Sequence, residues 1–112
     1  TFVERDRVAQ KILQENIANL GVEGDTALVR TSVSNWLGTA DIDKFDIIFV
    51  DPPYHDTQFS TVWRLLGLLK PGALMVLSHP GKGEVPIQEN GIVVVDNRSY
   101  GNAYLTFFRR DA

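Results

Sequence analysis

The sequence predicts an α/β fold: a mostly parallel sheet with helices on both faces and an antiparallel C-terminal strand. Apolar residues at helical spacing alternate with short apolar runs along residues 1–78, an order typical of parallel sheets. Two adjacent strand-like segments, residues 91–96 and 103–108, then close the chain. A length of 112 residues suits one compact domain. We therefore expect residues 1–112 to form a single, partial domain.

The N-terminal part of the chain predicts two strands separated by a helix. Residues 1–3 are expected to form a short strand, after which Asp6 caps a helix with a broad apolar stripe. Gly21 stands where a glycine typically ends a helix. Residues 26–31 are expected to form the second strand, and residues 32–37 a single helical turn.

The C-terminal part predicts a buried strand, a helix and three further strands. Residues 45–50 contain a continuous apolar run, which is typical of a strand buried on both faces. Apolar residues at helical spacing over residues 59–69 predict an amphipathic helix that Lys-Pro-Gly at residues 70–72 ends. The remaining expectations are a strand at residues 73–78, a loop at 81–86, and a turn or loop at 97–102.

Composition limits the classes of function. The chain has no cysteine, which excludes disulfides, thiolate metal sites and cysteine nucleophiles, and its two histidines do not form a cluster suited to a metal. No segment resembles a membrane span or a signal peptide, so we expect a cytoplasmic protein without a membrane partner. The net charge of −3 argues against a large basic surface for nucleic acid.

Polar side chains follow four of the expected strands. Ligands of open α/β sheets bind outside the carboxyl ends of the strands, so we expect these side chains at one rim. A structural role is the preferred interpretation for Ser32 and His79. The carboxylate of Glu4, in contrast, is suited to accept from both ribose hydroxyls of a nucleotide. A glutamate paired with Arg5 or Arg7 is the alternative. The four residues are Glu4, Ser32, Asp51 and His79.

The most specific signal is the motif formed by Asp51, Pro52, Pro53 and Tyr54. Its two prolines stiffen the backbone after a buried strand and leave carbonyl groups without ladder partners. The exocyclic amino group of a base fits such a notch, because the Asp51 carboxylate and the Pro52 carbonyl can each accept one of its N–H groups. Tyr54 can stack on the base, which would have to leave its helical stack. A rigid turn is the alternative interpretation.

These segments resemble the class I Rossmann-like methyltransferases that use S-adenosylmethionine, and among them the small-subunit ribosomal RNA guanine-N2 methyltransferases of the RsmD type. The resemblance covers nearly the whole chain, with its most specific matches at residues 2–6, 45–54 and 100–109. It implies a Rossmann-like fold whose first strand and glycine-rich motif are missing here. The family's basic N-terminal region, which would contact RNA, is expected to be missing as well.

The resemblance also implies an activity. The protein would transfer a methyl group from S-adenosylmethionine to the N2 amino group of guanine 966 in 16S rRNA, acting as a monomer on that RNA or on the assembled small subunit. An adenine-N6 methyltransferase, which shares the motif, and an inactive cofactor- or RNA-binding fragment are the alternatives. The implied base-binding residues are Asp51, Pro52, Pro53 and Tyr54, and the implied cofactor-binding residues are Glu4, Arg5, Ser32, Val33 and Asp51.

Overall fold

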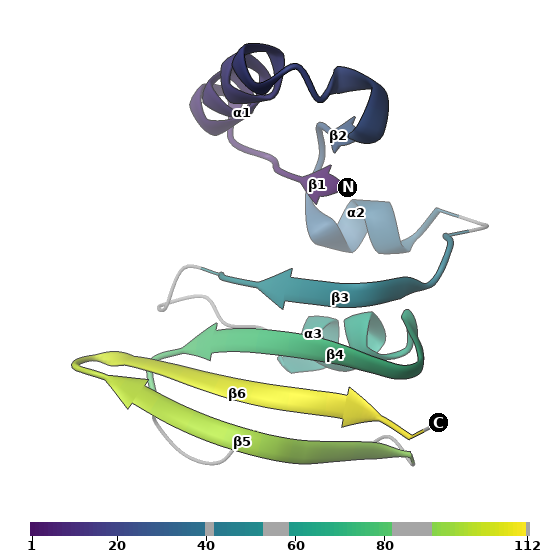
Figure 1. Ribbon diagram of the computed structural model, residues 1–112, viewed down its shortest axis with the longest axis vertical. Coiled ribbons are helices and arrows are strands. Elements are labelled where there is room, and N and C mark those ends of the chain that lie inside the picture. The colour runs from purple at the N-terminus through teal and green to yellow at the C-terminus, as the bar shows by residue number, and fades with distance from the viewer. Residues whose placement is uncertain (40–41, 53–58, 82–90, 112) are drawn as a thin grey trace. The chain divides into compact units, whose positions relative to one another are not determined.

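The computed structural model describes residues 1–39, 42–52, 59–81 and 91–111 (Figure 1). The chain divides into two compact units, Thr1–Asp41 and Ile42–Ala112. The first unit holds a two-stranded sheet and the second a four-stranded sheet. The α/β class predicted from the sequence is confirmed.

The first unit is built on the parallel pair of β1 (Phe2–Val3) and β2 (Leu28–Val29). Helix α1 (Arg7–Leu20) connects them, and its first turn is capped by the Asp6 side chain, which accepts from the backbone N–H of Ala9 at 2.8 Å. Gly21 ends the helix with φ +67°, a conformation that glycine adopts without strain. Both predicted ends of α1 are confirmed.

Two short helices flank β2. The 3₁₀ helix η1 (Glu23–Asp25) precedes it and was not predicted, while α2 (Val33–Leu37) is the predicted helical turn. Strand β2 has two residues, shorter than the expected strand over residues 26–31. Thr26 instead closes the preceding turn: its hydroxyl donates to the carbonyl of Val22, the residue before η1, at 3.0 Å.

The second unit is built on a sheet of strand order β3-β4-β6-β5. Strands β3 and β4 are parallel, whereas β6 is antiparallel to both of its neighbours (Figure 1). Because β6 lies between β4 and β5, it is the one strand of this sheet that runs against the others, as predicted for the C-terminal strand. The bounds are β3 Phe45–Val50, β4 Leu69–His79, β5 Ile92–Tyr100 and β6 Ala103–Arg110.

The core of the second unit lies between one face of this sheet and helix α3 (Phe59–Leu66). Alternate residues of β4 are buried on that face, and Phe108 of β6 is 0% exposed. The opposite face of β3 is open, since the side chains of Ile47 and Phe49 are 55% and 78% exposed. The prediction that β3 is buried on both faces is therefore wrong for the described part of this unit, where α3 covers one face.

The start of β4 also differs from prediction. Helix α3 ends at Leu66 rather than Leu69, and the Lys-Pro-Gly sequence expected to follow a helix lies inside the strand. A bulge makes this possible: Phe45 pairs with Leu69 and Ile47 with Leu74, so the extra residues, including Gly72 with φ +81°, need not continue the ladder.

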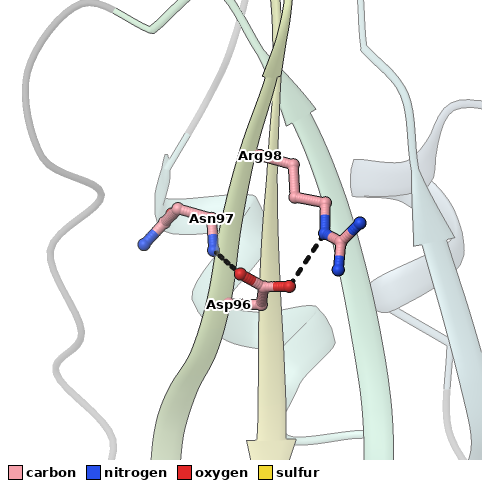
Figure 2. A network of polar contacts seen from close by, with 3 residues as sticks. All are labelled: Asp96, Asn97 and Arg98. Atoms are coloured by element: carbon pink, nitrogen blue, oxygen red, sulfur yellow. Dashed lines mark hydrogen bonds and ion pairs between the residues drawn. The ribbon is translucent and has the colours of Figure 1, made fainter.

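The hairpin of β5 and β6 is longer than predicted. Residues 97–100 continue β5, and the turn consists of Gly101 and Asn102 alone, so the expected turn or loop over residues 97–102 is wrong for its first four positions. Strand β5 bulges between Val94 and Asp96. Figure 2 shows the Asp96 carboxylate at this bulge, accepting from the backbone N–H of Asn97 and from Arg98 Nε, each at 2.9 Å.

Candidate functional site

In the first unit, the predicted cofactor-binding residues follow the carboxyl ends of β1 and β2. The backbone N–H of Glu4 donates to the carbonyl of Val29 at 3.0 Å, and the Glu4 carbonyl accepts from Gln10 Nε2 at 2.8 Å. One oxygen of the half-buried Glu4 carboxylate accepts from the backbone N–H of Arg5 at 3.1 Å. Backbone and side chain of Glu4 are thus held in place, and a carboxylate has further acceptor capacity for hydroxyl groups.

The other predicted residues of this unit have defined local roles. Ser32 caps α2, because its hydroxyl accepts from the backbone N–H of Asn35 at 3.1 Å. Val33 is the first residue of α2 and is half-buried, while the Arg5 side chain is exposed. This cap gives Ser32 a structural role at the start of α2, and the part of Ser32 and Val33 in cofactor binding stays a prediction.

In the second unit, Asp51 and Pro52 follow the carboxyl end of β3. Asp51 is exposed and Pro52 is half-buried, so the carboxylate lies open to solvent at the end of a strand. Pro53 and Tyr54 lie outside the described residues. The first half of the predicted motif therefore stands at the edge where ligands of open α/β sheets bind.

A buried polar cluster lies at the same end of the sheet, at the carboxyl end of β4. The side chains of His79 and Thr106 are 7% and 2% exposed, and His79 Nε2 lies 2.8 Å from Thr106 Oγ1. The Thr106 hydroxyl donates to Asn97 Oδ1 at 2.8 Å, and the backbone N–H of Gly81 donates to His79 Nδ1 at 3.2 Å. The Tyr104 ring stacks on His79, with centroids 6.0 Å apart.

Sequence reasoning found His79 but missed its partners. Thr106 is a hydroxyl residue between the apolar residues Leu105 and Phe107 of the closing strand, and it shares a side of that strand with the fully buried Phe108. That alternation was the available signal for a buried hydroxyl. Asn97 gave no such signal, because its facing depends on the β5 bulge.

Two pKa shifts follow from these surroundings. Burial lowers the pKa of His79 below its ordinary value of 6.5, because a charged ring is poorly solvated there. On exposed β5, the hydrogen bond from Arg98 lowers the pKa of Asp96. The neutral form of His79 and the ionised form of Asp96 are therefore favoured.

Within the described ranges, no three His, Asp or Glu side chains are grouped so as to hold a metal ion. The same residues include no helix of the length and apolarity needed to cross a membrane.

Comparison with known proteins gives these sites a family context. The family model described as conserved hypothetical protein 95 matches residues 1–109. The ribosomal RNA small subunit methyltransferase D of Buchnera aphidicola is 34% identical over 55 residues, which are 49% of this chain and 28% of that protein. The match thus spans less than a third of the relative's length.

Solved structures share the fold over nearly the whole chain. A conserved hypothetical protein of Streptococcus pyogenes superposes with a TM-score of 0.84 at 25% identity, covering 97% of this chain and 69% of that one. A candidate methyltransferase of Escherichia coli, yhhF, also gives 0.84, at 22% identity, covering 98% of this chain and 63% of that one. The chain belongs to the conserved hypothetical protein 95 family, which confirms its predicted kinship with RsmD-type methyltransferases.

Proposed function

We propose that the protein methylates the exocyclic N2 amino group of a guanine in 16S rRNA, at position 966. The observation that carries the proposal is the exposed Asp51, followed by Pro52, directly after the carboxyl end of β3. Membership of a family with a ribosomal RNA methyltransferase among its relatives supports the RNA substrate. The choice of guanine N2 rests on the resemblance of the motif.

The chemistry assigned to this motif follows from the properties of an amino group on a base. The nitrogen lone pair is delocalised into the ring, so the group is a weak nucleophile. The Asp51 carboxylate accepts one N–H and the Pro52 carbonyl the other, which favours a more pyramidal nitrogen with a directed lone pair. After transfer, Asp51 accepts the proton that the nitrogen loses. Pro53 and Tyr54 complete the notch, with Tyr54 stacked on the base.

S-adenosylmethionine is the proposed cofactor, and when bound it supplies an electrophilic methyl group on a sulfonium sulfur. The fold is shared with candidate methyltransferases, one named as dependent on this cofactor and one solved with S-adenosylhomocysteine. Glu4 fits the ribose, because its carboxylate accepts from the backbone N–H of Arg5 and retains further acceptor capacity. Ser32 and Val33 are proposed to border the adenine, and Arg5 and Asp51 to lie near the cofactor.

The proposed partner is 16S rRNA or the assembled small subunit, and the protein is proposed to act as a cytoplasmic monomer. The net charge of −3 argues against a large basic surface on these residues, since phosphate contacts normally require basic side chains; a preassembled particle as substrate, or basic side chains in a further segment, would each account for it.

The experiment that tests the proposal measures transfer of labelled methyl groups by the native protein. Naked 16S rRNA and small subunits from cells that lack the enzyme serve as substrates. Nucleoside analysis of the product distinguishes N2-methylguanosine from N6-methyladenosine. The expected product is N2-methylguanosine; N6-methyladenosine would establish the alternative specificity, and a complete lack of incorporation would support the inactive-fragment alternative.

A matched pair of variants tests the role of Asp51. Asp51→Ala is expected to lower kcat about 10²–10³-fold, comparable to the loss of one preorganised polar group from an active site, with the cofactor affinity little changed. Asp46→Ala is the control, since Asp46 is an exposed residue of the same strand that pairs with Lys70 at 3.3 Å. Equal activity of the two variants would remove Asp51 from the mechanism.

A further inference from the structure

The hydrogen bonds at the carboxyl end of β4 form a directed chain across three strands. The chain begins at the backbone N–H of Gly81, passes through His79 on β4 and Thr106 on β6, and ends at Asn97 on β5. Its three distances are 3.2, 2.8 and 2.8 Å. His79 is the titratable member of the chain, and the chemistry proposed for Asp51 and Pro52 leaves it without a role.

The donors and acceptors of this chain fix the tautomer of His79. A backbone N–H can only donate, so Nδ1 of His79 must accept from Gly81 and carries no proton. In the neutral ring, the proton is then on Nε2, which donates to Thr106 Oγ1. The Thr106 hydroxyl is left to donate to Asn97 Oδ1, in agreement with the observed geometry.

This chain of hydrogen bonds holds the segment by which the polypeptide leaves β4, formed by His79, Pro80 and Gly81 and called the exit corner below. Gly81 has φ +80°, and a Cβ atom at this position would lie 2.1 Å from the Tyr104 ring. The backbone of Gly81 therefore packs directly on a ring that also stacks on His79. Two contacts, one polar and one aromatic, set where the chain leaves the sheet.

The strand register brings this corner beside the candidate base-binding motif. Val50 of β3 pairs with Leu77 of β4. Pro52 comes two residues after Val50, just as His79 comes two residues after Leu77, so the two segments leave neighbouring strands at the same edge of the sheet. A leucine at position 79 would match the apolar residues 75 and 77 on the buried face of β4, whereas this strand instead ends in a histidine with a fixed tautomer.

We propose that neutral His79 is a positioning residue for methyl transfer, which holds the exit corner of β4 and thereby the strand edge beside Pro52. This inference rests on the proposed function for its catalytic consequence. Its mechanism is local: a second ring proton would place an N–H opposite the N–H of Gly81, so the corner would lose its polar contact. Acid conditions should then impair the geometry of the motif without removing any group that touches the base.

The surroundings of His79 support the neutral ring. The acidic and basic residues of β5, Asp96 and Arg98, are level with Phe107 and Leu105 of β6 and so lie on the opposite face. Burial lowers the pKa of His79, and Tyr104 is the titratable side chain stacked on it. Among the described residues, the polar side chains that share its face on the neighbouring strands are Tyr104 and Thr106 of β6 and Asn97 and Ser99 of β5.

Two substitutions at position 79 separate positioning from simple packing. His79→Asn retains an acceptor for the N–H of Gly81 and does not titrate, whereas His79→Leu fills the space without an acceptor. His79→Leu is expected to lower kcat about 10–100-fold, the scale of a small misplacement at a reacting centre. His79→Asn should stay within about fivefold of wild type, comparable to the loss of one neutral hydrogen bond. The KM for the cofactor should not change in either variant.

The pH profile supplies a readout that a packing role would not affect. The kcat of the native protein should fall on the acid side, with its midpoint below the ordinary histidine value of 6.5. In His79→Asn this decline should shift to lower pH or disappear. An unchanged acid limb in His79→Asn, or equal kcat for the Asn and Leu variants, would overturn the proposal.

Nuclear magnetic resonance tests the inference independently of methyl transfer. The ¹⁵N signals of the His79 ring should show a protonated Nε2 and an unprotonated Nδ1 near neutral pH. In Thr106→Val, which removes the acceptor of Nε2, that preference should weaken. The opposite tautomer in the native protein would refute the directed chain even if methylation occurs. The expected tautomer without methyl transfer to any RNA would instead locate the failure in the proposed function.

Discussion

Replacing Gly81 with alanine perturbs the exit corner of β4 at its tightest point. Gly81 has φ +80° and contacts the Tyr104 ring so closely that an added Cβ atom would lie 2.1 Å from Cδ2 and from Cε2. The added methyl group therefore creates two separate costs. One is backbone strain in the left-handed region, and the other is a clash with a ring that is held by His79.

The two costs have different magnitudes and can be separated. The left-handed conformation costs an alanine about 1–2 kcal/mol, and overpacking typically adds about 1–3 kcal/mol. Gly81→Ala should therefore lower the free energy of unfolding by roughly 2–5 kcal/mol. Gly72→Ala is the matched control, because Gly72 lies in β4 with φ +81° and has nothing within 4 Å of an added Cβ atom. It should show the strain cost alone.

Urea denaturation of the native protein measures both variants, alone and combined with Tyr104→Ala. Removing the ring should reduce the cost of Gly81→Ala to that of Gly72→Ala, and should leave the cost of Gly72→Ala unchanged. If Gly81→Ala and Gly72→Ala lowered the free energy of unfolding equally in the presence of Tyr104, the close approach of Gly81 to the Tyr104 ring would be refuted. A Gly81→Ala cost that is unaffected by Tyr104→Ala would show that the ring is not the obstacle.

Three further predictions concern stability. Phe108→Ala removes a fully buried ring and should cost about 3–5 kcal/mol in the free energy of unfolding; a loss below about 1 kcal/mol would contradict its place in the core. Asp6→Ala removes the α1 cap and should cost about 1 kcal/mol, seen as faster hydrogen exchange in the first turn of α1. Because the pKa of His79 is lower in the folded state, the unfolded ring binds a proton first as pH falls through 6.5. Stability, followed by the urea midpoint, should decline from there and level off below the folded pKa, and His79→Asn should flatten this dependence.

The elements that the sequence predicted best are those with local signals at their ends. Helix α1 begins after Asp6 and ends before Gly21, where a side-chain cap and a left-handed glycine act within a few residues. The start of β4 was missed because its Pro71 and Gly72 resemble a helix stop. They are tolerated in the strand through a bulge that depends on pairing with β3, and such pairing is not encoded locally.

The candidate site, too, was predicted only where its signals are local in the sequence. Asp51 was predicted at a strand end because the apolar run before it and the prolines after it are adjacent in sequence, and its described position agrees. The cluster around His79 joins residues 79, 97 and 106, whose contact depends on the order of three strands. The strand pattern predicted His79 as a polar residue at the end of a strand, but the tertiary structure was needed to show which residues hold it.

The bulge in β5 decides which side chain meets the buried threonine. Val94 pairs with Phe108, and regular pairing from there, with Val95 opposite Phe107, would bring Asp96 rather than Asn97 level with Thr106. A carboxylate there would accept from the same hydroxyl and would stabilise a protonated His79. Deletion of Arg98 or Ser99 would remove the bulge while Val94 and Tyr100 kept their partners, and it would exchange a neutral amide terminus for an anionic one. Length variation in β5, which a solvent-exposed hairpin would ordinarily tolerate, is therefore a route by which related proteins could change the pH range over which His79 stays neutral without altering the Asp-Pro-Pro-Tyr motif.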